Sequence, residues 1–300
     1  ATAQNDGPTP EDARRIEQAM KIRPEPRNNV VYEYPLATNA NVPRELVNKL
    51  QIVPSRDRFG AGGWIVSDDT GRIIRVFLDR VQDYADKSKA GNLDQWSYYK
   101  DGIEVYREVD TDKNQKPNEY RWLGPGGSRW GIDVNQDGEI DKWQAISAEE
   151  VAFEVFEAIK KRDSKRFDRL LLNGDELKSL NLEGEFASKI VAKVNDAKKG
   201  FADLVRNQKT ISANSEWIHS GNGMPSMAAA DKDGLGKDLL CYDHATSVYW
   251  TGEKIGTLAL GSIVRIDNVW RLIELPQFVE EGKAIVNGGV FFPIQQMQPN

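Results

Sequence analysis

Oxygen-bearing side chains recur at a fixed spacing in three segments of the chain. The segments open at Asp86, Asp110 and Asp133, so their first residues are 24 and 23 positions apart. In each segment an Asp or Asn returns eight residues after the opening Asp, and an aromatic residue follows two residues later. Side-chain oxygens at positions 1, 3, 5 and 9 suit a hard cation with oxygen ligands, and calcium is the obvious candidate. The spacing therefore predicts a tandem array of calcium-type loops.

The third segment has the fullest ligand set, because Gly138 permits a tight turn and the backbone carbonyl of Glu139 adds to the side chains. Its expected ligands are Asp133, Asn135, Asp137, Glu139 and Asp141. The second segment has fewer charges, so weaker binding is expected, and Lys116 stands where the third has Glu139. Its expected ligands are Asp110, Asp112, Asn114, Lys116 and Asn118. The first segment offers Asp86, Ser88 and Asp94, but Ala90 leaves one position empty. The alternative is that all three are polar turns without metal, since Asp, Asn and Gly form turns anyway.

Composition excludes several classes of protein. The chain has 300 residues, of which 39% are hydrophobic, so it can build two domains with real cores. The net charge of -6 argues against a nucleic-acid partner, because phosphate binding needs a basic face. No stretch approaches the ~20 apolar residues that a membrane span requires. Cys241 is the only cysteine, which excludes an internal disulfide, a CxxC redox pair and a cysteine-rich zinc site.

Two observations predict an exported protein, in the periplasm, at the cell surface or outside the cell. The sequence begins Ala-Thr-Ala-Gln, which resembles the small-residue end of a processed signal peptide. Calcium loops of modest affinity also suit such a location, because free calcium is high only outside the cytosol.

Strands must position the three loops. From Trp64 to Trp143 polar and apolar residues alternate, and turns at 68–71, 100–102 and 125–127 divide this stretch into hairpins. We therefore predict an arm with short helices over residues 1–53 and a β-hairpin repeat with three cation loops over residues 54–146. One hairpin cannot bury its own face, so stacked hairpins must share a core. The expected core aromatics are Trp64, Trp96, Tyr98, Tyr106, Trp122, Trp130 and Trp143.

Helical spacing replaces the period of two after residue 146. A capping box, Ser147 with Glu150, opens the first helix of this region. Further helices are expected at about 167–172 and 185–206, and strands at 215–219, 239–250, 254–266 and 269–275. This pattern predicts an α+β domain over residues 147–300 that ends in an apolar tail.

The third loop resembles the loops of dockerins and thrombospondin type 3 repeats, and the first half of an EF-hand. An EF-hand places a bidentate Glu at position 12, whereas this chain has Gln144. The flanking segments also have the pattern of strands rather than of paired helices. The resemblance therefore implies a static structural calcium site rather than a switch.

Residues 147–277 resemble NTF2-like (SnoaL-like) domains, because helices precede a curved antiparallel sheet that closes with a hairpin around Trp270. Some members of that fold use a His and an Asp inside the cone for acid–base chemistry, and many only bind or scaffold. Here the only histidines are His219 and His244. Asp243 and His244 are strand neighbours and point to opposite faces, so we expect structural or surface histidines.

The whole chain resembles the N-terminal region of bacterial exported multidomain redoxins, which carry a thioredoxin-like domain further on. The resemblance rests on Trp-Ser-Tyr-Tyr-Lys-Asp-Gly (96–102), Ser-Ala-Glu-Glu-Val (147–151) and Val-Trp-Arg-Leu-Ile-Glu-Leu-Pro (269–276). Because this chain lacks CxxC, the resemblance implies an accessory region beside a thioredoxin-like domain, and not disulfide exchange itself.

The sequence therefore predicts a non-catalytic, exported, calcium-binding protein: a scaffold, a surface or filament subunit, or an accessory region of a redoxin. The tail residues Val290, Phe291, Phe292 and Ile294 would either add as a strand to a neighbouring subunit or pack on their own domain. The rival is an enzyme or small-ligand binder that uses the cone of the second domain. That rival needs an aromatic-lined pocket that contains a histidine.

Overall fold

The computed structural model of the chain describes residues 51–54, 62–68, 70–80, 93–100, 102–124, 127–230, 234–280 and 289–292. The arm and helices predicted over residues 1–50 lie outside these ranges, as do Asp86, Ser88 and Ile294. The chain divides into two compact units between Trp143 and Gln144.

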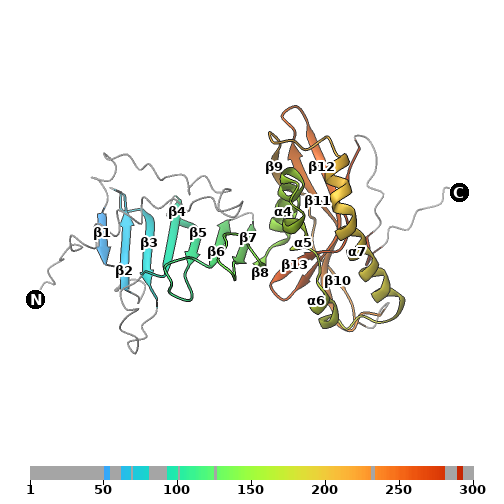
Figure 1. The fold of residues 1–300 in the computed structure, drawn as a ribbon, viewed down its shortest axis with the longest axis horizontal. Helices are drawn as coiled ribbons and strands as arrows, with labels where there is room; N and C mark the ends of the chain where they lie inside the picture. Colours follow the sequence, from blue (N-terminus) through green and yellow to red (C-terminus); the bar gives the residue numbers. More distant parts are fainter. Residues whose placement is uncertain are drawn as a thin grey trace, which may run out of the picture. The chain divides into compact units, whose positions relative to one another are not determined.

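The first unit is an antiparallel meander, coloured blue to green in Figure 1. Its strands are β1 (Gln51–Pro54), β2 (Gly62–Ser67), β3 (Ile73–Asp79), β4 (Gln95–Lys100), β5 (Ile103–Val109), β6 (Glu119–Gly124) and β7 (Gly127–Ile132), and the boundary between the units falls within the next strand, β8 (Lys142–Ile146). Each strand from β1 to β6 pairs antiparallel with the next strand along the chain. β8 lies beside β7 in the sheet. The prediction of antiparallel hairpins is confirmed. Because alternate connections of a meander lie at the same end of the sheet, the connections after β3, β5 and β7 are neighbours at one end of the strands.

A ladder of aromatic rings crosses the middle of this sheet. Tyr98, Tyr106 and Trp122 are cross-strand partners on β4, β5 and β6, with 5.5 Å between successive ring centroids. Arg75 stacks on Tyr98 at one end of the ladder and Arg129 on Trp122 at the other, at 4.6 and 4.4 Å from the ring centroids. All five side chains are buried. Cross-strand aromatic pairs and cation–π contacts both stabilise such a row.

Two of the expected core aromatics are only partly buried. Trp130 pairs with Arg121 on the opposite face from Trp122, and the Arg121 guanidinium lies 3.5 Å from the Trp130 ring centroid. Trp96 is half-buried near the start of β4, two residues after Asp94. Trp143 is buried and meets Trp122 edge-on at 6.4 Å. Alternation along β7 therefore keeps Trp130 out of the ladder, because it lies one residue from Arg129, which stacks on Trp122.

The second unit combines helices with antiparallel strands, so the predicted α+β class is confirmed. Its helices are α4 (Ala148–Lys161), α5 (Ser164–Asp168), α6 (Gly174–Ser179) and α7 (Gly184–Asn207). Ser147 caps α4 by accepting a hydrogen bond from the Glu150 backbone amide at 3.3 Å. The helix expected at 167–172 is instead α5, which Asp163 caps and which ends at Asp168.

The strands of the second unit are β9 (Glu216–Ser220), β10 (Ser226–Ala228), β11 (Leu239–Trp250), β12 (Ile255–Ile266), β13 (Val269–Leu272) and β14 (Gln277–Phe278). β11 pairs with β9, β10 and β12, and β12 pairs with β13 and β14, all antiparallel. The tight turn between β12 and β13 places Asp267 at a φ of 53°. The segment between the expected strands at 215–219 and 239–250 contains the short strand β10.

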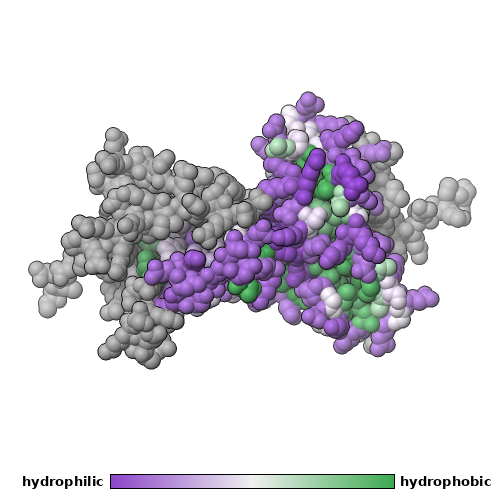
Figure 2. Space-filling model, in the orientation of Figure 1, coloured by the Kyte–Doolittle hydropathy of each residue, from purple (hydrophilic) through white to green (hydrophobic). Residues whose placement is uncertain are grey.

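Helices α4 and α7 supply much of the apolar core of the second unit. Phe156 of α4 packs against Tyr249 of β11, and Phe201 of α7 stacks on Phe167 with 4.1 Å between ring centroids. A buried ion pair joins Arg166 Nε to Glu154 Oε2 at 2.7 Å. In the view of Figure 2, purple hydrophilic residues cover most of the coloured surface, and green hydrophobic ones gather on the second unit.

The aromatic ladder leads to a stability prediction. Trp122→Ala should lower the free energy of unfolding by about 3–5 kcal/mol, because it removes the largest fully buried side chain and leaves Arg129 without its ring. Urea unfolding followed by circular dichroism measures this change. Ile103→Ala, at a position that is 67% exposed, is the control and should stay within about 0.5 kcal/mol. Equal effects of the two substitutions would contradict the role of the ladder.

Candidate cation-binding loops

Loop three (133–141) joins β7 to β8 and folds around the carboxylate of Asp133. This residue is 1% exposed. Its Oδ1 accepts a hydrogen bond from the Asp137 amide at 3.2 Å, and its Oδ2 accepts one from the Gly138 amide at 2.8 Å. At the far end of the loop, Asp141 Oδ2 accepts a hydrogen bond from the Val134 amide at 2.7 Å. The first and ninth residues, which the sequence analysis singled out, thus close the loop.

The side chains between these two ends also face one another. Asn135 Nδ2 donates to Asp137 Oδ2 at 3.1 Å, and Asn135 Oδ1 accepts from the Asp137 amide at 2.9 Å. Asp137 Oδ1 accepts from the Glu139 amide at 2.8 Å. The structure therefore gathers all five predicted ligand residues of loop three into one turn.

Loop two (110–118) joins β5 to β6 and repeats this arrangement. Asp110 is 1% exposed, and its two oxygens accept from the amides of Asn114 at 3.3 Å and Gln115 at 2.7 Å. Asn118 Oδ1 accepts from the Thr111 amide at 2.9 Å, as Asp141 does in loop three. The two loops therefore close through the same pair of positions.

The remaining predicted ligands of loop two lie together as well. Asn114 Nδ2 donates to Asp112 Oδ2 at 3.1 Å, and Asn114 Oδ1 accepts from the Lys116 amide at 2.9 Å. These contacts match those of Asn135, Asp137 and Glu139 in loop three.

Both loops have the same backbone conformation at their fourth and sixth positions. Lys113 and Gln136 have φ values of 58° and 57°, and Gln115 and Gly138 have φ values of 71° and 91°. Glycine adopts a positive φ without strain, but an ordinary residue pays roughly 1–2 kcal/mol for it. Gln115 nevertheless keeps the conformation, because its amide is one of the two that hold the buried Asp110 carboxylate.

The first connection, between β3 and β4, is longer than the other two. The Leu78 carbonyl accepts from the Asp94 amide at 2.9 Å, as the Val109 and Ile132 carbonyls accept from Asn118 and Asp141. The residue after Leu78 is Asp79, which therefore corresponds to Asp110 and Asp133. Asp86, the opening residue expected from the sequence, lies outside the described ranges.

Among the residues that the structure describes, no cationic side chain compensates the charge of the opening carboxylates of loops two and three. Burial raises the pKa of Asp133 above its ordinary value, while the Gly138 amide lowers it and the nearby Asp137 raises it. Burial, followed by a hydrogen bond to Asp112, raises the pKa of Asp110. No Lys or Arg of the described residues forms an ion pair with the Asp residues of either loop. A buried, uncompensated negative charge favours a bound cation.

The donor set limits which cation would fit. Among the described residues, no group of three or more His, Cys, Asp or Glu side chains could hold a metal ion. A cation at loop two or three would therefore need Asn oxygens, backbone carbonyls or water beside the carboxylates. Calcium accepts such mixed oxygen sets, whereas zinc requires nitrogen, sulfur or closely set carboxylate ligands.

Comparisons of the chain with models of protein families, with curated proteins and with solved structures found no match. The resemblances to redoxins, to NTF2-like domains and to known calcium loops therefore stay predictions. Within the described ranges, no helix is long and apolar enough to cross a membrane.

The second unit buries another carboxylate, which the C-terminal segment 289–292 covers. Asp243 is 7% exposed, and its Oδ1 accepts from Ser262 Oγ at 2.5 Å. Its Oδ2 accepts from the backbone amides of Phe291 at 3.1 Å and Phe292 at 2.5 Å. Val290 is 3% exposed, and its amide donates to Ser262 Oγ. These residues of the tail therefore pack on their own domain, which is one of the two alternatives predicted for the tail.

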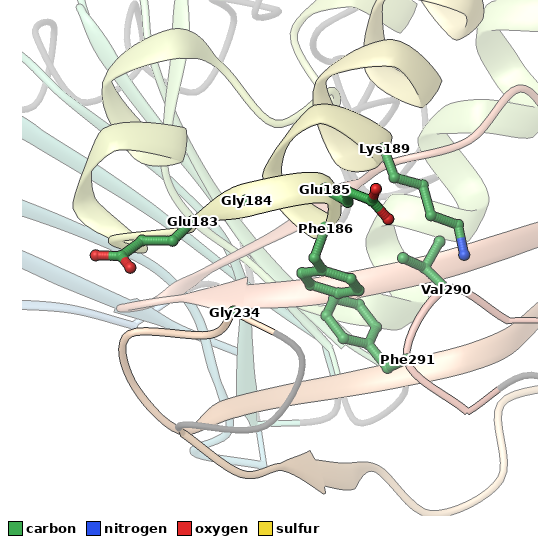
Figure 3. A pocket seen from close by; sticks show the side chains of 8 residues that line it. All are labelled: Glu183, Gly184, Glu185, Phe186, Lys189, Gly234, Val290 and Phe291. Carbon is green, nitrogen blue, oxygen red and sulfur yellow. The ribbon is translucent and has the colours of Figure 1, made fainter.

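A surface pocket of about 750 Å³ lies beside this segment. Figure 3 shows the rings of Phe186 and Phe291 against each other in the pocket wall, with Val290 nearby. The two rings meet edge-on, with 5.6 Å between their centroids.

The histidines and the cysteine give no support to a catalytic site in this unit. His219 and His244 are both exposed, and neither lines the pocket. Cys241 is buried, and burial together with the charge of Asp243 raises its pKa to about 12, so it stays a neutral thiol. The alternation of buried Asp243 and exposed His244 follows the strand period.

The tail contact can be tested by one added methyl group. A Cβ on Gly289 would lie 1.8 Å from Asp243 Oδ2. Gly289→Ala should therefore destabilise the protein by about 1–3 kcal/mol, because the segment must shift away from its carboxylate. Gly223→Ala is the matched control, since nothing lies within 4 Å of its Cβ. Urea unfolding compares the two variants, and a neutral Gly289→Ala would exclude the close contact.

Proposed function

We propose that the chain is a calcium-binding protein in which loops two and three each hold one ion and thereby stabilise the first unit. The proposal rests on the buried opening residues Asp110 and Asp133, whose charge no cationic side chain compensates within the described part of the chain. Both loops also share a positive φ at their fourth and sixth positions, and hydrogen bonds join their predicted ligand residues within each loop. The ligands in this proposal are Asp110, Asp112, Asn114, Lys116 and Asn118 in loop two, and Asp133, Asn135, Asp137, Glu139 and Asp141 in loop three.

The flanking strands favour a static site over a switch. Each loop is anchored at both ends by backbone hydrogen bonds of the sheet, such as Asp141 N to Ile132 O at 2.8 Å. An EF-hand switch works by changing the angle between two helices, and a pair of sheet strands has no comparable freedom. With two or three carboxylates in each loop, a dissociation constant of ~0.1–1 mM is expected, in the range of extracellular modules. Calcium outside the cytosol would then occupy the sites constitutively.

We further propose that the protein is exported and acts as a scaffold, a surface or filament subunit, or an accessory region of a redoxin. The second unit would be an NTF2-like domain in this proposal. Support comes from α4 and α7, which supply core residues against the strands of an antiparallel sheet, and from the closing β12–β13 hairpin with Trp270. The alternative, a small-ligand binder, would act at the pocket beside Phe186 and Phe291.

Calcium should raise the melting temperature. At ten times the dissociation constant each site contributes about 1.4 kcal/mol, and each 1 kcal/mol shifts melting by roughly 2–4 °C. Asp137→Ala should remove more than half of the shift, because only the more weakly binding loop two then remains. Differential scanning calorimetry in EDTA and in millimolar calcium measures the shift, and magnesium serves as the control ion.

Asp203→Ala, which removes a largely exposed carboxylate from α7, is the matched control and should keep the full calcium shift. No calcium shift in the wild-type protein would reduce both loops to ordinary polar turns. An equal shift with magnesium would contradict calcium selectivity.

The calcium shift should shrink as the pH falls. In the metal-free fold, the pKa values of Asp110 and Asp133 are raised above that of free Asp. Their contribution to stability is therefore present below the unfolded pKa and is lost as the pH rises through the folded pKa. Calcium binds only the deprotonated carboxylates, so it contributes least where the loops are protonated. Melting at about pH 7 and about pH 5 compares the two shifts, and equal shifts would contradict the proposal.

A further inference from the structure

The three connections form a row that hydrogen bonds link from one to the next. The carbonyl of Asp94, the last residue of the first connection, accepts from the Asp110 amide at 2.9 Å. The carbonyl of Asn118, the last residue of loop two, accepts from the Asp133 amide at 3.0 Å. The last residue of the first connection and that of loop two are thus each bonded to the opening residue of the following loop.

The fourth residue of each loop reaches back into the preceding connection. Lys113 of loop two places its Nζ 2.8 Å from Asp79 Oδ1 and 3.7 Å from Asp94 Oδ2. Gln136 of loop three donates from Nε2 to Asp112 Oδ2 at 2.9 Å, and its Oε1 accepts from Asn114 Nδ2 at 2.7 Å. Both residues have the same left-handed backbone, which aims both side chains the same way.

The side chains of Lys113 and Gln136 differ in charge, so they act differently on the carboxylates that they contact. The Lys113 ammonium, with its side chain 5% exposed, lies against both carboxylates of the first connection, and Arg80 Nε adds a second positive charge 3.4 Å from Asp94 Oδ1. Gln136 is neutral, so it holds Asp112 and Asn114 in place and leaves the negative charge of loop two for a cation from solution. The same position therefore supplies a resident cation in one case and an orienting amide in the other.

We propose that calcium binding at loops two and three is positively coupled through Gln136. This inference rests on the proposed function. Gln136 lies between Asn135 and Asp137, two ligands of loop three, so an ion in loop three fixes the backbone that carries it. The fixed amide then holds Asp112 and Asn114, two ligands of loop two, near their liganded positions. Preorganisation of this kind reduces the ordering that the second ion must cause.

The coupling has a quantitative signature, because it must be reciprocal. If loop three strengthens binding at loop two by some factor, then loop two strengthens binding at loop three by the same factor. We expect a factor of ~5–10, at the lower end of the usual range for coupled sites.

Calorimetric titration of the full chain with calcium provides the test. Asp137→Ala disables loop three and should weaken loop two about 5–10-fold relative to the wild type. Asp112→Ala disables loop two and should weaken loop three by the same factor. Gln136→Ala keeps all of the predicted ligands, so it should still bind two calcium ions. The two ions should bind independently, so that the first no longer increases the affinity for the second. Gln277→Ala removes the same kind of side chain from an exposed position in β14 and should bind calcium as the wild type does.

The possible failures are distinguishable. Two calcium ions that bind the wild type and Gln136→Ala with identical, independent affinities would overturn the coupling and leave the proposed function standing. Under the proposal, Asp137→Ala already breaks the route through Gln136, so adding Gln136→Ala should not weaken calcium binding at loop two any further. A further loss of affinity in the double variant Asp137→Ala/Gln136→Ala would therefore also overturn the coupling. No calcium binding by the wild type would overturn the proposed function and this inference together.

Discussion

The buried opening carboxylate is the constraint on which the first unit depends. A meander brings alternate connections to the same end of the sheet. At that end Asp110 and Asp133 directly follow β5 and β7, and Asp79 is the last residue of β3. Asp110 and Asp133 are almost fully buried there. A carboxylate in such a place must be compensated by hydrogen bonds or by positive charge. The backbone of each loop is arranged around that need, even at Gln115, where it requires an unfavourable φ.

The protein meets this need in more than one way. In the first connection a lysine of the neighbouring loop supplies the positive charge. In loops two and three, backbone amides bind the carboxylates, and a dissolved cation would complete the compensation. In the second unit Asp243 is bound by Ser262 and by the amides of the C-terminal segment. In each of these places a carboxylate holds a segment of chain in position: the side chain of a neighbouring loop, the backbone of its own loop, or the C-terminal segment.

The aromatic ladder explains why the loops keep a constant relation to one another. Tyr98, Tyr106 and Trp122 lie in register on three consecutive strands, and an arginine stacks on each end of the row. Fixed register holds each connection a constant two strands from the next. Only with that spacing can one side chain, Lys113 or Gln136, reach from its own loop to the preceding one.

The sequence by itself determined the local features. Alternating aromatic and polar residues predicted the hairpins, the helical spacing after residue 146 predicted the α+β second unit, and the repeated Asp and Asn residues identified which side chains gather in each loop. These features depend on neighbours within a few residues, so they are readable from the chain. The tertiary structure alone decided that Asp79 holds the position in the sheet that Asp110 and Asp133 hold, that Trp130 lies outside the ladder, and that Lys113 and Gln136 link the loops. It also decided that Val290 and Phe291 pack on their own unit around Asp243. Each of these outcomes depends on strand register and chain path, which bring together residues that no local spacing relates.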